Sequence, residues 1–202
     1  MKTALDTRGE PLSPEALRML DYLRTRSEEM STGGIRERIR AAALELDKLV
    51  GEISETEART RPFSGKWTIA EVVDHIAQTQ IRGAEELRHL LAGRRPPGPP
   101  VYEALRSGAS AWAPWAELVD GLREANQSML DLLESAPDGP EEPGAPTVRT
   151  ILVVTRTLPN GETGPQIFVG ECSWKEYAIL QRLHLLDHRT QVKNIRASIA
   201  GR

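Results

Sequence analysis

The residues best suited to chemistry are two histidines, His184 and His188, in the segment 174–199. Residues four apart on an α-helix lie one above the other on the same face. Such a pair can give one metal ion two imidazole ligands from a single rigid element. Two surface histidines that happen to have this spacing would look the same, so the pair alone leaves both interpretations open.

The pair belongs to a line of residues spaced alternately four and three apart, which marks one face of a helix in a bundle. That face carries Tyr177, Gln181, His184, His188, Gln191 and Ile195. A surface helix normally carries Lys, Arg and Glu on such a face, so we expect this one to line a pocket. Tyr177 and Gln181 are expected to line that pocket or to pack. Gln191, one turn beyond His188, is expected to hold its ring or to contact a ligand.

A third ligand has few sources, because the only other histidines are His75 and His89. Both fall in a predicted helix over 69–92, where His75 points roughly 130° away from the apolar stripe. That direction means either solvent or a second groove shared with another helix. The fourteen residues between them span about 21 Å of helix, so one site cannot use both. His75 is the better candidate, and His89 is expected at the surface.

Four segments have the apolar periodicity and length of bundle helices: 35–54, 69–92, 113–135 and 174–199. Thr68 and Glu71 form a capping box at the start of the second, so Glu71 is interpreted as a cap and not as a general base. A shorter helix is expected from Pro14 to about Glu29. Residues 1–13 are expected to form a flexible arm, and the Pro- and acid-rich segment 136–146 is expected to be exposed and mobile.

One region is β-like. Two runs rich in β-branched residues, 147–157 and 166–172, flank an Asn160-Gly161 turn. This pattern predicts a hairpin. An isolated hairpin is marginally stable, so it should pack on the bundle or on a second subunit.

Composition limits the class of protein. A length of 202 residues fits one domain, with or without an appendage. The net charge of −3 comes without a long basic block, so nucleic acid is not an expected partner. A single cysteine, Cys172, rules out an intrachain disulfide framework and favours a reducing compartment. No signal peptide or membrane-spanning run is found. We expect a cytoplasmic protein with no membrane partner.

Several other residues are interpreted as structural. Asp74 and Asp187 neighbour histidines in sequence, but adjacent helical residues point elsewhere, so both are expected to be solvated charges. Cys172 is expected to be a small packed residue. The four tryptophans are interpreted as core and helix-end packing and not as a cofactor site: Trp67, Trp112, Trp115 and Trp174.

Two motifs in this order resemble the DinB/YfiT-like family. The first comprises Pro62, residues 67–71 and His75; the second comprises His184, His188, Arg189 and Gln191. The resemblance covers about residues 35–135 and 173–200. It implies an all-α fold, a four-helix bundle with up-down-down-up connections over 35–202. The extension 1–34, with its short helix, and the hairpin 147–172 inserted before the last helix depart from the compact family pattern.

The resemblance also implies a function. One divalent metal ion (zinc, nickel, iron or manganese) would be bound by His75, His184 and His188, with positions left open for water or a thiol. Family members are similar to transferases and isomerases that use a low-molecular-weight thiol, others to metal-dependent hydrolases, and many are dimers. We therefore expect a metal-dependent thiol S-transferase or hydrolase acting on a small-molecule substrate, in a possible homodimer. The alternative is a non-catalytic bundle, for dimerisation or ligand binding, with a structural metal or none.

Overall fold

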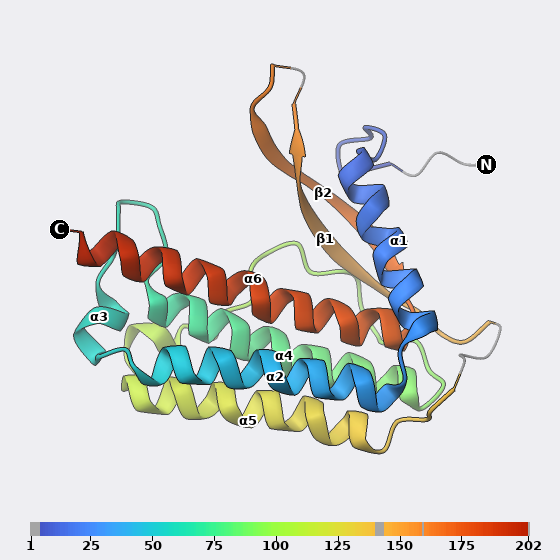
Figure 1. Ribbon diagram of the computed structural model, residues 1–202, viewed down its shortest axis with the longest axis horizontal. Coiled ribbons are helices and arrows are strands. Elements are labelled where there is room, and N and C mark those ends of the chain that lie inside the picture. The colour runs from blue at the N-terminus through green and yellow to red at the C-terminus, as the bar shows by residue number, and fades with distance from the viewer. Residues whose placement is uncertain (1–4, 140–143, 159, 202) are drawn as a thin grey trace.

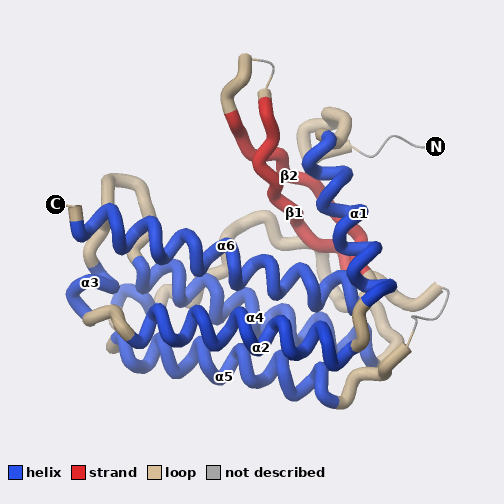
Figure 2. Tube along the Cα trace, viewed as in Figure 1, coloured by secondary structure: helices blue, strands red, loops and turns tan. Residues whose placement is uncertain are grey.

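The computed structural model describes residues 5–139, 144–158 and 160–201 (Figure 1). Its elements, in chain order, are α1 (Pro14–Glu29), α2 (Thr32–Gly51), the short α3 (Glu55–Arg59), α4 (Ile69–Leu91), the 3₁₀ turn η1 (Ala109–Ala111), α5 (Trp115–Glu134), β1 (Val148–Thr157), β2 (Thr163–Cys172) and α6 (Trp174–Ala200). The described chain is mostly helical, with one two-stranded antiparallel sheet (Figure 2).

Four long helices, α2, α4, α5 and α6, lie side by side. Both α2 and α4 contact α5 and α6, so each helix has two neighbours around a common core. The large side chains of that core are fully buried and come from the apolar stripes of the helices: Ile39, Leu46, Ile76, Leu87, Leu122, Met129 and Leu133. The apolar periodicity thus predicts the four long helices correctly. α2 begins at Thr32 and not at residue 35, because the hydroxyl of Ser31 caps it.

Both helices that carry histidines start at a capping box. Thr68 accepts a hydrogen bond from Glu71 N, and the Glu71 carboxylate accepts one from Thr68 N at 2.7 Å. Ser173 and Glu176 repeat this arrangement at the start of α6. The two boxes fix where α4 and α6 begin and therefore which residues share a face. The interpretation of Glu71 as a cap is confirmed.

The hairpin and α1 stand together on one side of the bundle (Figures 1 and 2). The strands are antiparallel, with Thr157 opposite Thr163. One face of the sheet packs on α1 through a small cluster of Leu152, Phe168 and Ala16, all at most 1% exposed. The prediction of a hairpin is confirmed, although β2 begins at Thr163 and not at residue 166.

The expected flexible arm, residues 1–13, lies partly outside the described residues, and its segment 6–13 is a folded turn. The carboxylate of Asp6 accepts hydrogen bonds from the N–H groups of Arg8 and Glu10. Gln166 of β2, fully buried, accepts a hydrogen bond from Ser13 N and donates to Pro11 O and to Asp6. A single buried amide therefore ties the start of the chain to the hairpin. The sequence does not show this, because Gln166 lies more than 150 residues away.

The segment 136–146, expected to be mobile, lies partly outside the described residues. Its described start is held by Thr32 at the beginning of α2. Thr32 Oγ1 donates to Pro137 O at 2.6 Å, and Thr32 N donates to Asp138 Oδ1 at 3.0 Å. Across the described ranges, none of the helices has both the length and the apolar character required to cross a bilayer.

Candidate metal centre

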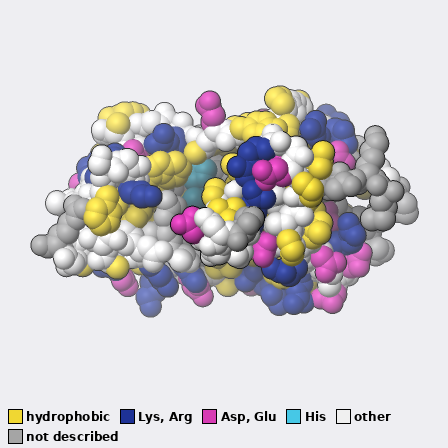
Figure 3. Space-filling view, turned by 90° about the horizontal axis from the view of Figure 1, so that it is seen from above, with side chains coloured by type: hydrophobic (Ala, Val, Ile, Leu, Met, Phe, Trp, Pro, Cys, Tyr) yellow, Lys and Arg dark blue, Asp and Glu magenta, His cyan; other side chains and the backbone are white. Residues whose placement is uncertain are grey.

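Three histidines from two helices meet at one point. His75 of α4 faces His184 and His188 of α6. The Nε2 atom of His184 lies 3.2 Å from that of His75 and 2.9 Å from that of His188. The three ring centroids are 4.3 to 5.1 Å apart. Seen from above, histidine side chains (cyan) lie in a hollow near the middle of this face of the molecule (Figure 3).

The spacing suits ligands of one ion. Nitrogens bound at about 2.0–2.1 Å from a common metal lie roughly 3 Å from one another. Histidine is the only residue type in the cluster, and its candidate ligand atoms all lie within 4.8 Å of one another. The residues present therefore fit a divalent ion held by imidazole nitrogen.

The outer nitrogens of two rings show which nitrogen carries the proton. His75 Nδ1 lies 2.9 Å from the carbonyl oxygen of Leu105, and His188 Nδ1 lies 2.6 Å from Gln191 Oε1. Both partners are acceptors, so in each neutral ring Nδ1 donates and Nε2 keeps a lone pair. Two lone pairs thus point into the cluster. This is the arrangement in which a histidine ligates a metal through Nε2 while a partner holds its other nitrogen.

Burial keeps these rings neutral. It lowers the pKa of His75 and of His188, and it lowers the pKa of His184 well below 6.5, helped there by the neighbouring His188 and His75. The hydrogen bonds that His75 donates to the Leu105 carbonyl and His188 donates to Gln191 raise the pKa but do not cancel the effect of burial. Since metal ions bind the neutral imidazole, the ligands are already in the binding form near neutral pH.

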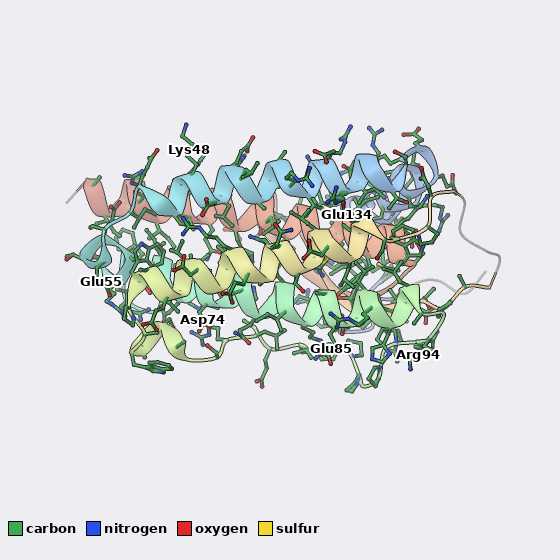
Figure 4. All side chains as sticks on the ribbon, turned by 90° about the horizontal axis from the view of Figure 1, so that it is seen from below. Lys48, Glu55, Asp74, Glu85, Arg94 and Glu134 are labelled. Carbon is green, nitrogen blue, oxygen red and sulfur yellow. The ribbon has the colours of Figure 1, made fainter. Side chains whose placement is uncertain are left out.

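Asp74 is buried, so the expectation of a solvated charge is wrong. Only 2% of it is exposed, and its carboxylate accepts three hydrogen bonds: from Ser107 Oγ at 2.6 Å, Ser107 N at 3.2 Å and Gly108 N at 3.1 Å. Figure 4 labels Asp74 near the connection between α4 and α5. Gly108 has φ +81°, a backbone conformation that glycine adopts without strain. The segment between α4 and α5 therefore folds back over α4 and covers a carboxylate that helix geometry alone leaves open.

The three hydrogen bonds that Asp74 accepts, called the clamp below, and the contact between Leu105 and His75 involve the same segment. Asp74 holds Ser107 and Gly108, while the carbonyl of Leu105 receives the Nδ1 hydrogen of His75. Asp74 and His75, which are adjacent on α4, thus both form hydrogen bonds with the same short stretch of chain. Asp187, which precedes His188 in the same way, is exposed as expected.

A cavity of about 890 Å³ opens beside the histidines. It is bordered by α4, α6, β1 and the segment 100–105. Tyr177 and Gln181 are buried, and both line it; Gln191 lies behind His188 and is not among the lining residues. Two buried oxygens on this lining, Thr79 Oγ1 and Gln181 Oε1, have no hydrogen-bond partner within the described part of the chain.

The cavity has a second polar group of residues. The Tyr177 hydroxyl donates to the carboxylate of Glu86, which also accepts a hydrogen bond from Arg82 Nε at 2.8 Å. Burial, together with Glu86, raises the pKa of Tyr177 well above 10. Tyr177 is therefore a neutral donor. Sequence analysis does not identify Glu86 and Arg82 as site residues, because Tyr177, which contacts Glu86, lies 91 residues away from it along the chain.

The remaining candidates are not part of the histidine cluster. His89 is not part of the cluster, and Arg189 forms an ion pair with Glu45 of α2. Trp67 contacts His75 edge-on, with the ring centroids 5.3 Å apart. Trp115 and Trp174 are buried as expected, but Trp112 is 75% exposed, so its interpretation as a packing residue is wrong.

Cys172 is packed as expected. It is 1% exposed at the end of β2, and burial raises the pKa of its thiol to about 12. Its sulfur is therefore a protonated core atom.

Comparison with known proteins identifies the family. No curated protein matches the chain. A crystal structure from Exiguobacterium sibiricum 255-15, described as that of a candidate DinB family member, aligns with 84% of this chain and 91% of its own at 18% identity and a TM-score of 0.48. The profile of the DinB superfamily matches residues 38–156, which is more than half of the sequence and includes His75. The chain therefore belongs to the DinB superfamily.

Proposed function

We propose that this protein is a metal-dependent enzyme in which His75, His184 and His188 bind one divalent ion. The observation that carries the proposal is the convergence of three Nε2 atoms, separated by 2.9 and 3.2 Å, beside a cavity of about 890 Å³. Zinc, nickel, iron and manganese all accept imidazole ligands. Only two helices supply the ligands, so the ion would have open positions on the cavity side.

The chemistry follows from that donor set. When bound, a divalent ion held by neutral imidazoles lowers the pKa of a water or thiol at its open position, so that hydroxide or thiolate is available near neutral pH. The chain's own residues orient the site. Leu105 and Gln191 hold the outer nitrogens of two rings, and Trp67 covers an edge of His75. The Tyr177 hydroxyl donates its hydrogen to Glu86, so its oxygen is left as an acceptor for the other end of a ligand.

The reaction class we propose is transfer of a low-molecular-weight thiol to a small electrophile, or hydrolysis of that electrophile. Cys172 is buried and protonated, so the thiol would have to come from outside the protein. A reducing, cytoplasmic location is part of this proposal and is supported by the single cysteine. The up-down-down-up order of the bundle is part of it too. The long connection over 92–114 supports that order, because it gives the chain room to return before α5 begins.

The direct test is metal content by mass spectrometry, before and after chelation. We expect about one ion per chain in the wild type and none in His75→Ala or His184→Ala. His89→Ala is the matched control, since His89 lies on α4 outside the cluster and its loss should leave the metal in place. Circular dichroism should show that the variants keep their helices. Stoichiometric metal in His184→Ala, or no metal in the wild type after reconstitution, would refute the assignment of ligands.

A second measurement separates an enzyme from a non-catalytic bundle. The metal-loaded protein is incubated with a model electrophile and a small thiol, and with the electrophile and water alone. Product formation that disappears on chelation and in His75→Ala supports catalysis. Bound metal without any turnover above the metal-free protein would favour the non-catalytic module.

A further inference from the structure

Strand β1 borders the cavity with the edge that does not pair with β2. In an antiparallel pair, successive residues alternate between bonding the partner strand and pointing their N–H and C=O groups away from it. Leu158 N donates to Glu162 O at 2.7 Å, one step beyond the Thr157–Thr163 pair. Even-numbered residues of β1 therefore bond β2. The odd-numbered residues Ile151, Val153 and Thr155 point their backbone groups outward.

Two features of β2 agree with this alternation. Pro165 lies opposite Thr155, at a position where no N–H is needed for the ladder. Ile167 lies opposite Val153, and its carbonyl accepts a hydrogen bond from Thr7 N at 3.0 Å on the side away from β1. Both residues therefore have their backbone groups on the outer edge of β2.

The two edges of the sheet differ in whether other segments of the chain cover them. The outer edge of β2 is closed by Pro165 and by the N-terminal turn at Thr7. Along β1, no described residue bonds the outward groups of Ile151, Val153 and Thr155. Natural proteins usually protect a free sheet edge from pairing, so the unprotected edge of β1 is a candidate binding surface for an added strand.

The open edge meets the cavity. Thr150, Ile151, Leu152 and Val153 all border it. Consecutive strand residues point their side chains to opposite faces, so a space that touches all four meets the strand at its edge. The same cavity is bordered by His184 and by Gln181, whose Oε1 is buried and has no partner among the described residues. Both sides of the space thus carry polar groups that have no partner within the described chain.

We propose that this edge binds an extended, peptide-like small molecule that carries at least two secondary amides and lies beside β1 as a short added strand. Outward groups two residues apart repeat every ~7 Å, so Ile151 to Thr155 spans roughly 14 Å, the length of about a tripeptide with a cap at each end. Strand addition uses main-chain hydrogen bonds for affinity. The proposal rests on the proposed function, since it names the class of thiol or electrophile that reaches the histidines. The occupant is a small molecule because the edge borders a cavity of ligand size.

The test titrates metal-free, ¹⁵N-labelled protein with N-acetyl-trialanine N-methylamide and follows the backbone amides. We expect saturable shifts at Ile151, Val153 and Thr155. A second probe is the same peptide methylated on the nitrogens of its second and third alanines. Neighbouring N–H groups face opposite edges of a strand, so this probe lacks one donor toward β1 in either register and should bind about tenfold more weakly, the effect of losing one hydrogen bond. Because the protein in this titration contains no metal, peptide binding is measured independently of metal binding. Loss of metal in His75→Ala therefore tests the proposed function, and these shifts test the edge.

A matched pair of variants tests the strand itself. Val153→Pro removes an outward N–H without removing a bond to β2, whereas Val153→Ala keeps that N–H. We expect the proline variant to weaken trialanine binding about tenfold and the alanine variant to leave it within about twofold. Contacts of Leu152 and Val154 with β2, measured in the NMR spectra of each variant, show whether the hairpin persists. Where these contacts are lost, the methylated peptide alone tests the proposal.

Three results would overturn the proposal: no saturable shift up to millimolar probe, equal binding of the two peptides, or equal binding to Val153→Pro with the hairpin intact. Shifts at the same amides that appear on raising protein concentration without probe would instead assign the edge to a second copy of the chain.

Discussion

Removing the Asp74 carboxylate should weaken metal binding at a histidine that it does not touch. Asp74→Ala deletes the acceptor of three hydrogen bonds from Ser107 and Gly108. A hydrogen bond to a charged group contributes about 1.5–3 kcal/mol, and the two freed N–H groups can turn to water, so we expect about 2–4 kcal/mol of lost unfolding free energy. The Leu105 carbonyl is then no longer held against His75 Nδ1. Loss of such a partner costs about tenfold or more in metal affinity.

Asp74→Asn sharpens the experiment because it conserves volume. Its amide oxygen can still accept from Ser107, but its NH₂ group then faces Gly108 N–H, so we expect an effect in the same direction and smaller. Stability is measured by denaturant unfolding of metal-free protein, and zinc affinity by competition with a chelator. Glu85→Gln is the control, since Glu85 is an exposed carboxylate of α4 that does not border the cavity. Zinc affinity unchanged in Asp74→Ala, despite lower stability, would refute the coupling between the clamp and His75.

Two further predictions use the same assays. Gln191→Leu removes the acceptor of His188 Nδ1, and we expect zinc affinity to fall about 10–100-fold with little change in helicity; unchanged affinity would show that Gln191 does not orient the ring. The metal-free protein should also lose stability as pH falls below about 6.5. Because burial lowers the pKa of all three histidines in the folded chain, the unfolded chain takes up protons first, so stability is complete above that pH and decreases below it. Denaturation midpoints at pH 7.5 and 5.5 measure this, and His184→Ala should reduce the difference.

Local signals explain what could be predicted. The capping box at Thr68 fixes the start of α4, and helix geometry then turns His75 away from the apolar stripe. The spacing of His184 and His188 places both on one face of α6. Each inference needs only a few neighbouring residues, and the structure brings all three side chains together.

Contacts between distant segments explain what could not be predicted. Asp74 meets its partners 33 residues later, where the connection after α4 folds back. Pro165 hides the first residues of β2, because proline is unusual inside a strand and only the register shows that its nitrogen faces outward. The N-terminal turn depends on Gln166 in the same way. These features depend on tertiary pairing and leave no periodic signal.

The burial of the Cys172 thiol has a consequence for the resistance of the chain to oxidation and alkylation. With a pKa of about 12, only about one sulfur in 10⁵ is ionised at pH 7, and the atom is 1% exposed. A reactive electrophile bound in the cavity would therefore find no competing protein nucleophile of this kind. Disulfides formed from spent small thiols would likewise leave the chain unmodified. The one cysteine of the chain is therefore protected from both alkylation and mixed-disulfide formation.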